Sequence, residues 1–160
     1  MEAKVELEIE QKCLNAVGLP MDWAACVWDA DARRLCEPTT FELGELDEVA
    51  CSVPCFYVGA TVSPSWRMNG GENARWHMPG HMAQGWRKMT VVCCRLGHAA
   101  RDLEVILINY GLNKYGDRCA NKARDSRGFR CGADEPGFVY VSCFLFAEAD
   151  LAIRRIGSRC

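Results

Sequence analysis

The strongest constraint on the fold is a helical pattern in residues 97–115, GHAARDLEVILINYGLNKY. Its apolar side chains recur every three or four positions and so form one stripe along a helix. They are Ala99, Leu103, Ile106, Leu107 and Tyr110. Glu104 borders this stripe, which predicts a carboxylate at the rim of the core. Such a stripe must pack against another layer of structure, so the chain is expected to fold in layers.

Apolar runs rich in β-branched and aromatic residues supply that second layer. They cover residues 48–61, 86–96 and 137–146, and turn residues bound each of them. A further strand is expected at 23–30, and a helix beginning at Pro64 with Ser63 as its N-cap. We predict an α/β (α+β) domain whose small antiparallel or mixed sheet of three or more strands is flanked by helices.

The remaining segments carry weaker patterns. Residues 2–18 allow either a helix or a strand leading into a helix, and residues 36–48 are expected to form a polar excursion. No linker or repeat divides the 160 residues, so one domain over 1–160 is predicted.

The beginning of the chain and its hydropathy bear on location. The first residues lack a basic segment followed by an apolar core, so no secretory signal is expected. No apolar run approaches the roughly 18 residues that a membrane span needs. We expect an intracellular protein that is not secreted and has no membrane partner.

Eleven cysteines stand out in the composition. Their odd number and irregular spacing argue against a secreted disulfide framework. The ligand spacings of common zinc sites are missing, and most of the cysteines lie in apolar runs, where a thiol behaves as a small hydrophobe. Buried, reduced thiols are therefore predicted. A zinc-binding or redox-responsive interaction protein remains an alternative.

Charge is distributed unevenly along the chain. Residues 1–50 hold 12 acidic and 4 basic side chains, whereas residues 51–132 hold 5 acidic and 12 basic ones. A basic middle in a chain of net charge −2 indicates a local site for a polyanion, although pairing with the acidic arm would also explain it. Tryptophans alternate with basic residues there, which suits stacking on unpaired bases. The candidate nucleic-acid-binding residues are Trp66, Arg75, Arg87, Lys88, Lys122, Arg124 and Arg127.

The stretch FYVGATVSPSWRM, residues 56–68, combines a phenol and a guanidinium at a strand-to-helix junction. Arg67 falls near the start of the expected helix, where anions are favoured and a guanidinium can hold a phosphate by two prongs. Glu104 offers a single carboxylate on a rigid helix, which is enough to hold Mg²⁺ together with waters. These groups match roles that phosphodiester cleavage requires.

In this order the segments resemble the GIY-YIG nuclease family. YVG at 57–59 matches the second signature, Y-[IV]-G, and GATVSPSWRM is similar to the next segment, with Arg67 ten residues after Tyr57. DLEVILINYGLNK resembles the helix that carries the metal-binding glutamate, and CANKARDSRGF the closing segment that contains Asn121. The resemblance covers about residues 53–130, with a possible first strand at 23–30.

The resemblance implies a metal-dependent endonuclease that cleaves DNA or structured nucleic acid. Tyr57 would position or activate the attacking water, and Arg67 would stabilise the phosphate. Glu104 would hold one Mg²⁺ or Mn²⁺ ion, and Asn121 would brace the site. The N-terminal extension and the strand at 137–146 would then elaborate this core, and nucleic acid, DNA in the first place, would be the partner.

Two departures from the family pattern affect the site. The first signature, G-[IV]-Y, is missing ahead of Tyr57, and the nearest similar sequence is CVW at 26–28. The position four residues after Arg67, where the family often has a histidine or tyrosine, is Gly71. His77 or His81 is expected to serve as the base instead.

Structural roles for the same residues remain open. Tyr57 could be a core tyrosine, Arg67 and Glu104 could form ion pairs, and Asn121 could belong to a turn. The alternative to a nuclease is therefore a catalytically degenerate module of the same fold that binds nucleic acid or protein.

Overall fold

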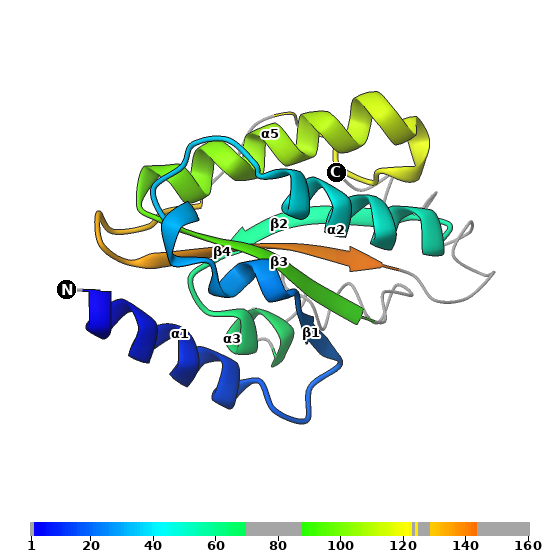
Figure 1. The fold of residues 1–160 in the computed structure, drawn as a ribbon. Coiled ribbons are helices and arrows are strands. Elements are labelled where there is room, and N and C mark those ends of the chain that lie inside the picture. The colour runs from blue at the N-terminus through cyan, green and yellow to red at the C-terminus, as the bar shows by residue number, and fades with distance from the viewer. Residues whose placement is uncertain (1, 70–87, 123, 125–128, 144–160) are drawn as a thin grey trace.

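A computed structural model describes residues 2–69, 88–122, 124 and 129–143 (Figure 1). Four strands form one sheet in the order β1-β3-β4-β2. They are β1 (Met21–Trp23), β2 (Phe56–Thr61), β3 (Lys88–Leu96) and β4 (Pro136–Cys143). β4 is antiparallel to both β2 and β3, whereas β1 is parallel to β3. This mixed sheet with flanking helices confirms the predicted fold class.

Helices cover both faces of the sheet (Figure 1). On one face lie α2 (Thr40–Ser52) and α5 (His98–Tyr115), and on the other α1 (Glu2–Asn15) and α3 (Pro64–Asn69). Short 3-10 helices are η1 (Ala25–Trp28), η2 (Ala30–Ala32) and η4 (Gly116–Arg118). The predicted helices at 97–115 and from Pro64 are confirmed. Among the helices of the described residues, none has the length and apolarity to cross a membrane.

The sheet is completed by the strand that the sequence places last. β4 lies between β3 and β2, and every one of its residues is buried. The predicted strand at 137–146 is thus present as β4, but it links β3 to β2 in the interior of the sheet and is not an elaboration added to the core. The N-terminal segment is also part of the core, because Ile9 of α1 is fully buried with Tyr140 of β4 in one cluster.

The strand expected at 23–30 is wrong in its extent. β1 ends at Trp23, and the chain then turns through η1 and η2. The Asp29 side chain accepts a hydrogen bond from the backbone N–H of Asp31 at 3.0 Å, a local turn that competes with strand pairing. The apolar residues of this segment therefore lie in two short 3-10 helices.

The polar excursion expected at 36–48 is also wrong, because α2 begins within it. The Thr39 hydroxyl accepts from the backbone N–H of Glu42 at 3.2 Å, and the Glu42 carboxylate accepts from the N–H of Thr39 at 3.2 Å. This is a capping box, and the sequence T-x-x-E before an apolar helical face is its signal. Leu46 and Ala50 of that face are fully buried against the sheet.

A buried ion pair joins α2 to β3. Arg95 and Glu42 are both fully buried and bind through two parallel hydrogen bonds of 2.7 Å. The remaining guanidinium N–H groups donate to carbonyls in the chain leading into α2 and on β3, those of Leu35, Glu37 and Cys94. Every donor of Arg95 is therefore satisfied, as a buried charge requires.

A β-bulge directs Arg95 toward its partner. The register between β3 and β4 shifts between Val91 and Cys93, so Val92 is an extra residue. Val92 and Cys93 consequently belong to the same core cluster, on the α2 and α5 side. The bulge thus reverses the alternation that follows it and brings Arg95 to that side, where Glu42 lies.

Replacing Arg95 by methionine is expected to lower the free energy of unfolding by roughly 3–5 kcal/mol, because the Glu42 carboxylate would remain buried without its partner. Replacing Arg95 and Glu42 together by methionines should cost less, since no buried charge remains. Arg34→Met is the control: Arg34 pairs with Asp134 at 3.1 Å in an exposed position, and its loss should cost under about 1 kcal/mol. Urea titration measures all three, and equal losses for the single and double replacements would contradict this account.

A second polar contact joins α2 to α5 near the surface. Asp47 accepts hydrogen bonds from the hydroxyls of Tyr110 (2.9 Å) and Tyr115 and from the ammonium of Lys114 (3.0 Å). Partial burial raises the pKa of Asp47, but the hydrogen bonds from Tyr115, Lys114 and Tyr110 together outweigh it. The pKa therefore lies below the ordinary value of 3.8.

This lowered pKa predicts a pH-dependent contribution to stability. A carboxylate with a lowered folded-state pKa stabilises the fold above its unfolded pKa and loses that contribution as the pH falls. Asp47→Asn should therefore be less stable than the parent protein at neutral pH, and the difference should shrink below about pH 4. Thermal unfolding at a series of pH values measures this difference, and a constant difference would argue against it.

Candidate active site

The outer edge of β2 is closed by side chains from other elements. Val58 donates its backbone N–H to the Asn121 side-chain oxygen, and the Asn121 amide donates to the Val58 carbonyl, each at 2.8 Å. Two residues further on, the Arg67 guanidinium donates to the Ala60 carbonyl at 3.3 Å. An exposed strand edge would leave these groups unpaired. Two predicted site residues, Asn121 and Arg67, thus lie side by side along one edge.

Gly59 lies between these two contacts, and because it has no side chain, the ring of a tyrosine can lie against its backbone. A Cβ atom at Gly59 would lie 2.5 Å from both Cζ and the hydroxyl oxygen of Tyr140, its neighbour on β4. The end of the Tyr140 ring therefore covers the backbone of Gly59. Tyr57, two residues earlier on β2, is half-buried and belongs to the same face of the sheet.

The phenol of Tyr140 lies within electrostatic reach of two opposite charges. Burial raises the pKa of Tyr140, which is only 4% exposed; the charge on Arg67 lowers this pKa, and the charge on Glu104 raises it further. Glu104 on α5 is itself only 7% exposed, as its place beside the apolar stripe predicts. Because the net shift is upward, the phenol stays neutral at physiological pH and is a hydrogen-bond donor.

Tyr57, Arg67 and Asn121 lie on or beside the edge of β2, and come from β2, α3 and the segment after η4. Tyr140 of β4 covers Gly59 at this edge, and Glu104 of α5 is near enough to Tyr140 for its charge to act on the phenol. We call the five residues Tyr57, Arg67, Glu104, Asn121 and Tyr140 the β2-edge site. The first four were predicted from the sequence, although their predicted roles remain predictions. Tyr140 was missed. Its signal is GFVY at 137–140, a glycine, apolar residues and a tyrosine that follow the helix instead of preceding Tyr57.

The other described candidates for nucleic-acid binding are spread over the molecule. Trp66 is exposed on α3 next to Arg67, and Lys122 is exposed next to Asn121, so both adjoin the β2-edge site. Arg124 donates to the Asn109 and Asn113 side chains of α5 at 2.9 and 3.1 Å. Lys88 instead begins β3, separated from β2 by β4, and forms an ion pair with Asp22.

Some of the basic side chains in the middle of the chain bind groups within the fold. Arg95 is fully buried against Glu42, and the Arg118 guanidinium donates to the carbonyls of Ala50 and Val53 at the end of α2. Both charges are engaged in contacts within the fold. His77, His81, Arg75, Arg87 and Arg127 lie outside the described residues.

The described acidic residues, histidines and cysteines include no group of three or more that could hold a metal ion. The donor set of the β2-edge site is therefore one carboxylate, Glu104. Mg²⁺ keeps several waters and commonly takes one or two carboxylates together with phosphate oxygens, so a single protein carboxylate is compatible with this ion.

The ten cysteines of the described segments are all free thiols, half of them buried. Burial raises the pKa of Cys94 to about 12 and that of Cys143 to about 11, so these thiols stay protonated and are poor nucleophiles or metal ligands. The thiols at Cys36 and Cys51 are exposed, so the expectation of buried cysteines holds for only part of the set.

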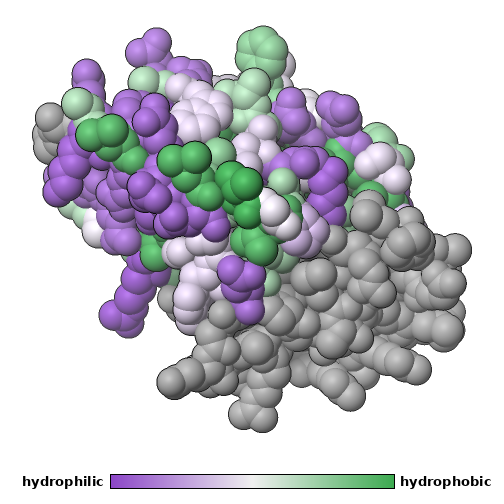
Figure 2. All heavy atoms as spheres, turned by 90° about the horizontal axis from the view of Figure 1, so that it is seen from below, coloured by the Kyte–Doolittle hydropathy of each residue, from purple (hydrophilic) through white to green (hydrophobic). Residues whose placement is uncertain are grey.

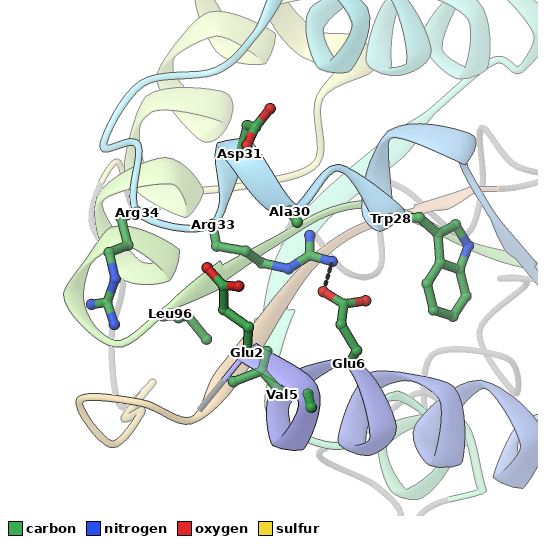
Figure 3. A pocket seen from close by; sticks show the side chains of 10 residues that line it. Glu2, Val5, Glu6, Trp28, Ala30, Asp31, Arg33, Arg34 and Leu96 are labelled. Atoms are coloured by element: carbon green, nitrogen blue, oxygen red, sulfur yellow. Dashed lines mark hydrogen bonds and ion pairs between the residues drawn. The ribbon is translucent and has the colours of Figure 1, made fainter.

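A separate cavity of about 660 Å³ lies between α1 and the η1–η2 segment (Figure 3). Arg33 lies in its wall and donates to Glu6 of α1 at 3.3 Å, while Trp28 borders it. None of the residues of the β2-edge site lines this cavity. Its mixed charges, with Glu2, Glu6 and Asp31 beside Arg33 and Arg34, do not select one class of ligand.

Comparison with known proteins does not identify a relative: no family model, curated protein or solved structure matches this chain. The β2-edge site therefore has to be interpreted from its own geometry.

The contact between Gly59 and Tyr140 can be tested by adding one methyl group. Gly59→Ala is expected to lower the free energy of unfolding by roughly 1–3 kcal/mol, because the new Cβ would overlap the Tyr140 ring. Gly44→Ala is the matched control. Gly44 lies within helix α2, and no other segment comes within 4 Å of the position that an alanine methyl group would take, so alanine should stabilise the helix instead. In a Tyr140→Ala background the penalty at Gly59 should largely disappear. A penalty that persists there would exclude the ring as its cause.

Proposed function

We propose that the protein is a metal-dependent endonuclease that hydrolyses phosphodiester bonds of DNA or structured nucleic acid at the β2-edge site. The observation that carries the proposal is that Arg67 binds the edge of β2 next to Gly59, which the Tyr140 ring covers, and that the charges of both Arg67 and Glu104 act on the Tyr140 phenol. A cation, a carboxylate and a neutral phenol in one place can bind a phosphodiester and stabilise the charge that develops during its cleavage.

Each side chain has a role in this proposal. Arg67 would bind the phosphate and stabilise its developing negative charge. The neutral phenol of Tyr140 would donate a hydrogen bond to a phosphate oxygen, supplying the hydroxyl that the missing first signature would otherwise contribute. Tyr57 would position the attacking water. Asn121 would hold β2 in place through Val58.

Glu104 would hold one Mg²⁺ or Mn²⁺ ion, which when bound polarises the phosphate oxygens. The general base is assigned to His77 or His81, because histidine ordinarily exchanges protons near neutral pH. Trp66 and Lys122, exposed beside the site, would contact the bases and phosphates that flank the cleaved bond.

A second candidate function is nucleic-acid or protein binding without cleavage. It is favoured by one observation: Asn121 and Arg67 also close the backbone of the β2 edge, so the fold alone would retain both of them. In that case the protein should bind DNA with an affinity that falls as salt rises, and should not cut it.

The experiment is a cleavage assay with single-stranded, duplex and branched DNA in Mg²⁺ or Mn²⁺. Glu104→Gln, Arg67→Ala and Tyr140→Phe should each reduce the rate by roughly 100-fold or more, because each removes a group that stabilises the transition state. Asp102→Asn is the matched control, since Asp102 is exposed on the same helix as Glu104 and loses the same charge. Its rate should stay close to that of the parent protein.

Two outcomes would reject the proposal. Folded protein that cuts none of the substrates would favour the second candidate, binding of nucleic acid or protein without cleavage. Cutting that survives Glu104→Gln as well as it survives Asp102→Asn would move the activity away from the β2-edge site. Thermal unfolding of every variant separates a lost reaction from a lost fold.

A further inference from the structure

A side chain of the N-terminal helix reaches the turn that carries Arg67. Lys12 of α1 donates a hydrogen bond from its ammonium to the backbone carbonyl of Val62. Val62 follows directly on β2 and precedes Pro64, where α3 begins. This contact joins residues 50 positions apart in the sequence.

The carbonyls of this turn have different donors. That of Ala60 accepts from the Arg67 guanidinium at 3.3 Å, and that of Ser63 accepts from the Arg67 backbone N–H at 3.0 Å. The Val62 carbonyl between them accepts from Lys12. Two of the contacts thus come from Arg67 itself, and the third comes from α1.

The surroundings of Lys12 hold its ammonium at this point. The side chain is only 17% exposed, and Glu8, one helical turn earlier, pairs with it at 3.3 Å. The ammonium also lies 5.6 Å from the centre of the Phe138 ring, and Phe138 is the β4 partner of Thr61 in the sheet register. Lys12 therefore contacts the residue that follows β2, Val62, and also lies near the residue of β4 that pairs with the last residue of β2.

The rest of α1 is attached by few contacts, among them the hydrogen bond that Arg33 donates to Glu6. Val5 and Ile9 are its buried side chains, whereas Leu7 and Leu14 face outward together with Val17, which follows the helix. Apolar side chains accordingly stand among hydrophilic ones on this face of the molecule (Figure 2). Since so few side chains of α1 enter the core, a polar contact such as that of Lys12 carries a larger share of its attachment.

From these contacts we infer that Lys12 is a positioning residue: it fixes the turn at Val62 and thereby sets Arg67 toward the phosphate of the substrate. The consequence for catalysis rests on the proposed function, whereas the fixing of the turn does not. Loss of the ammonium leaves the Val62 carbonyl without this donor and lets the start of α3 shift. A small displacement of a phosphate-binding group is enough to reduce the rate of cleavage strongly.

The first test measures the turn without using activity. Amide hydrogen exchange is compared in the parent protein, Lys12→Met and Lys4→Met, the last of which alters an exposed lysine of the same helix. Lys12→Met should speed the exchange of the Ser63 and Arg67 amides by roughly 10-fold, while Lys4→Met should leave it unchanged. Lys12→Arg, which keeps a cationic donor, should restore slow exchange. Unchanged exchange in Lys12→Met would overturn the inference.

The second test asks whether Lys12 acts through Arg67. Lys12→Met should lower kcat for DNA cleavage by roughly 10- to 100-fold, and this loss should vanish in an Arg67→Ala background. Losses that simply add would mean that Lys12 does not work through Arg67, which would also overturn the inference. A parent protein that cuts no DNA would reject the proposed function instead, and the exchange measurement would still decide whether Lys12 fixes the turn.

Discussion

The buried pair between Glu42 and Arg95 is the interaction on which the arrangement of the α2 and α5 layer depends. Two charges without exposure can remain in a core only if each is fully hydrogen-bonded, and here the guanidinium binds the carboxylate and three carbonyls. The pair ties the start of α2 to β3 and fixes the chain that leads into α2. It also depends on the β-bulge, which turns Arg95 to the side where Glu42 lies.

Polar side chains also satisfy backbone groups at the edge of β2. An edge strand needs donors and acceptors for its outward backbone groups, and Asn121 and Arg67 provide them. Closing the edge brings these two polar side chains beside Gly59, the position where Tyr140 crosses the strand. The requirements of the sheet and the chemistry of the candidate site are therefore met by the same residues.

Sequence patterns identified most helices and strands of the fold, but not which of them lie next to each other in the structure. The helix at 97–115 followed from its stripe, and the start of α3 followed from Pro64, since both signals are local. The helix α2 was missed although its capping box, Thr39 with Glu42, is written in the sequence. The segment at 23–30 was misjudged because an apolar run does not distinguish a strand from short helical turns.

The residues of the candidate site and its surroundings also fall into those that the sequence marked and those that it did not. Tyr57, Arg67, Glu104 and Asn121 were recognisable because motif spacing along the chain marks them. Lys12 and Tyr140 were not, since each reaches the site from a segment distant in sequence, and no local pattern records which side chain will meet a given carbonyl or glycine.

The sequence by itself determined the fold class, the helix at 97–115, the start of α3 and the residue types available for phosphate chemistry, because local periodicity and side-chain chemistry specify these. Only the tertiary structure decided that β4 occupies the interior of the sheet, and that its Tyr140 lies where the charges of Arg67 and Glu104 act on one hydroxyl. Strand order depends on which faces can be buried together, and that is a property of the whole folded chain.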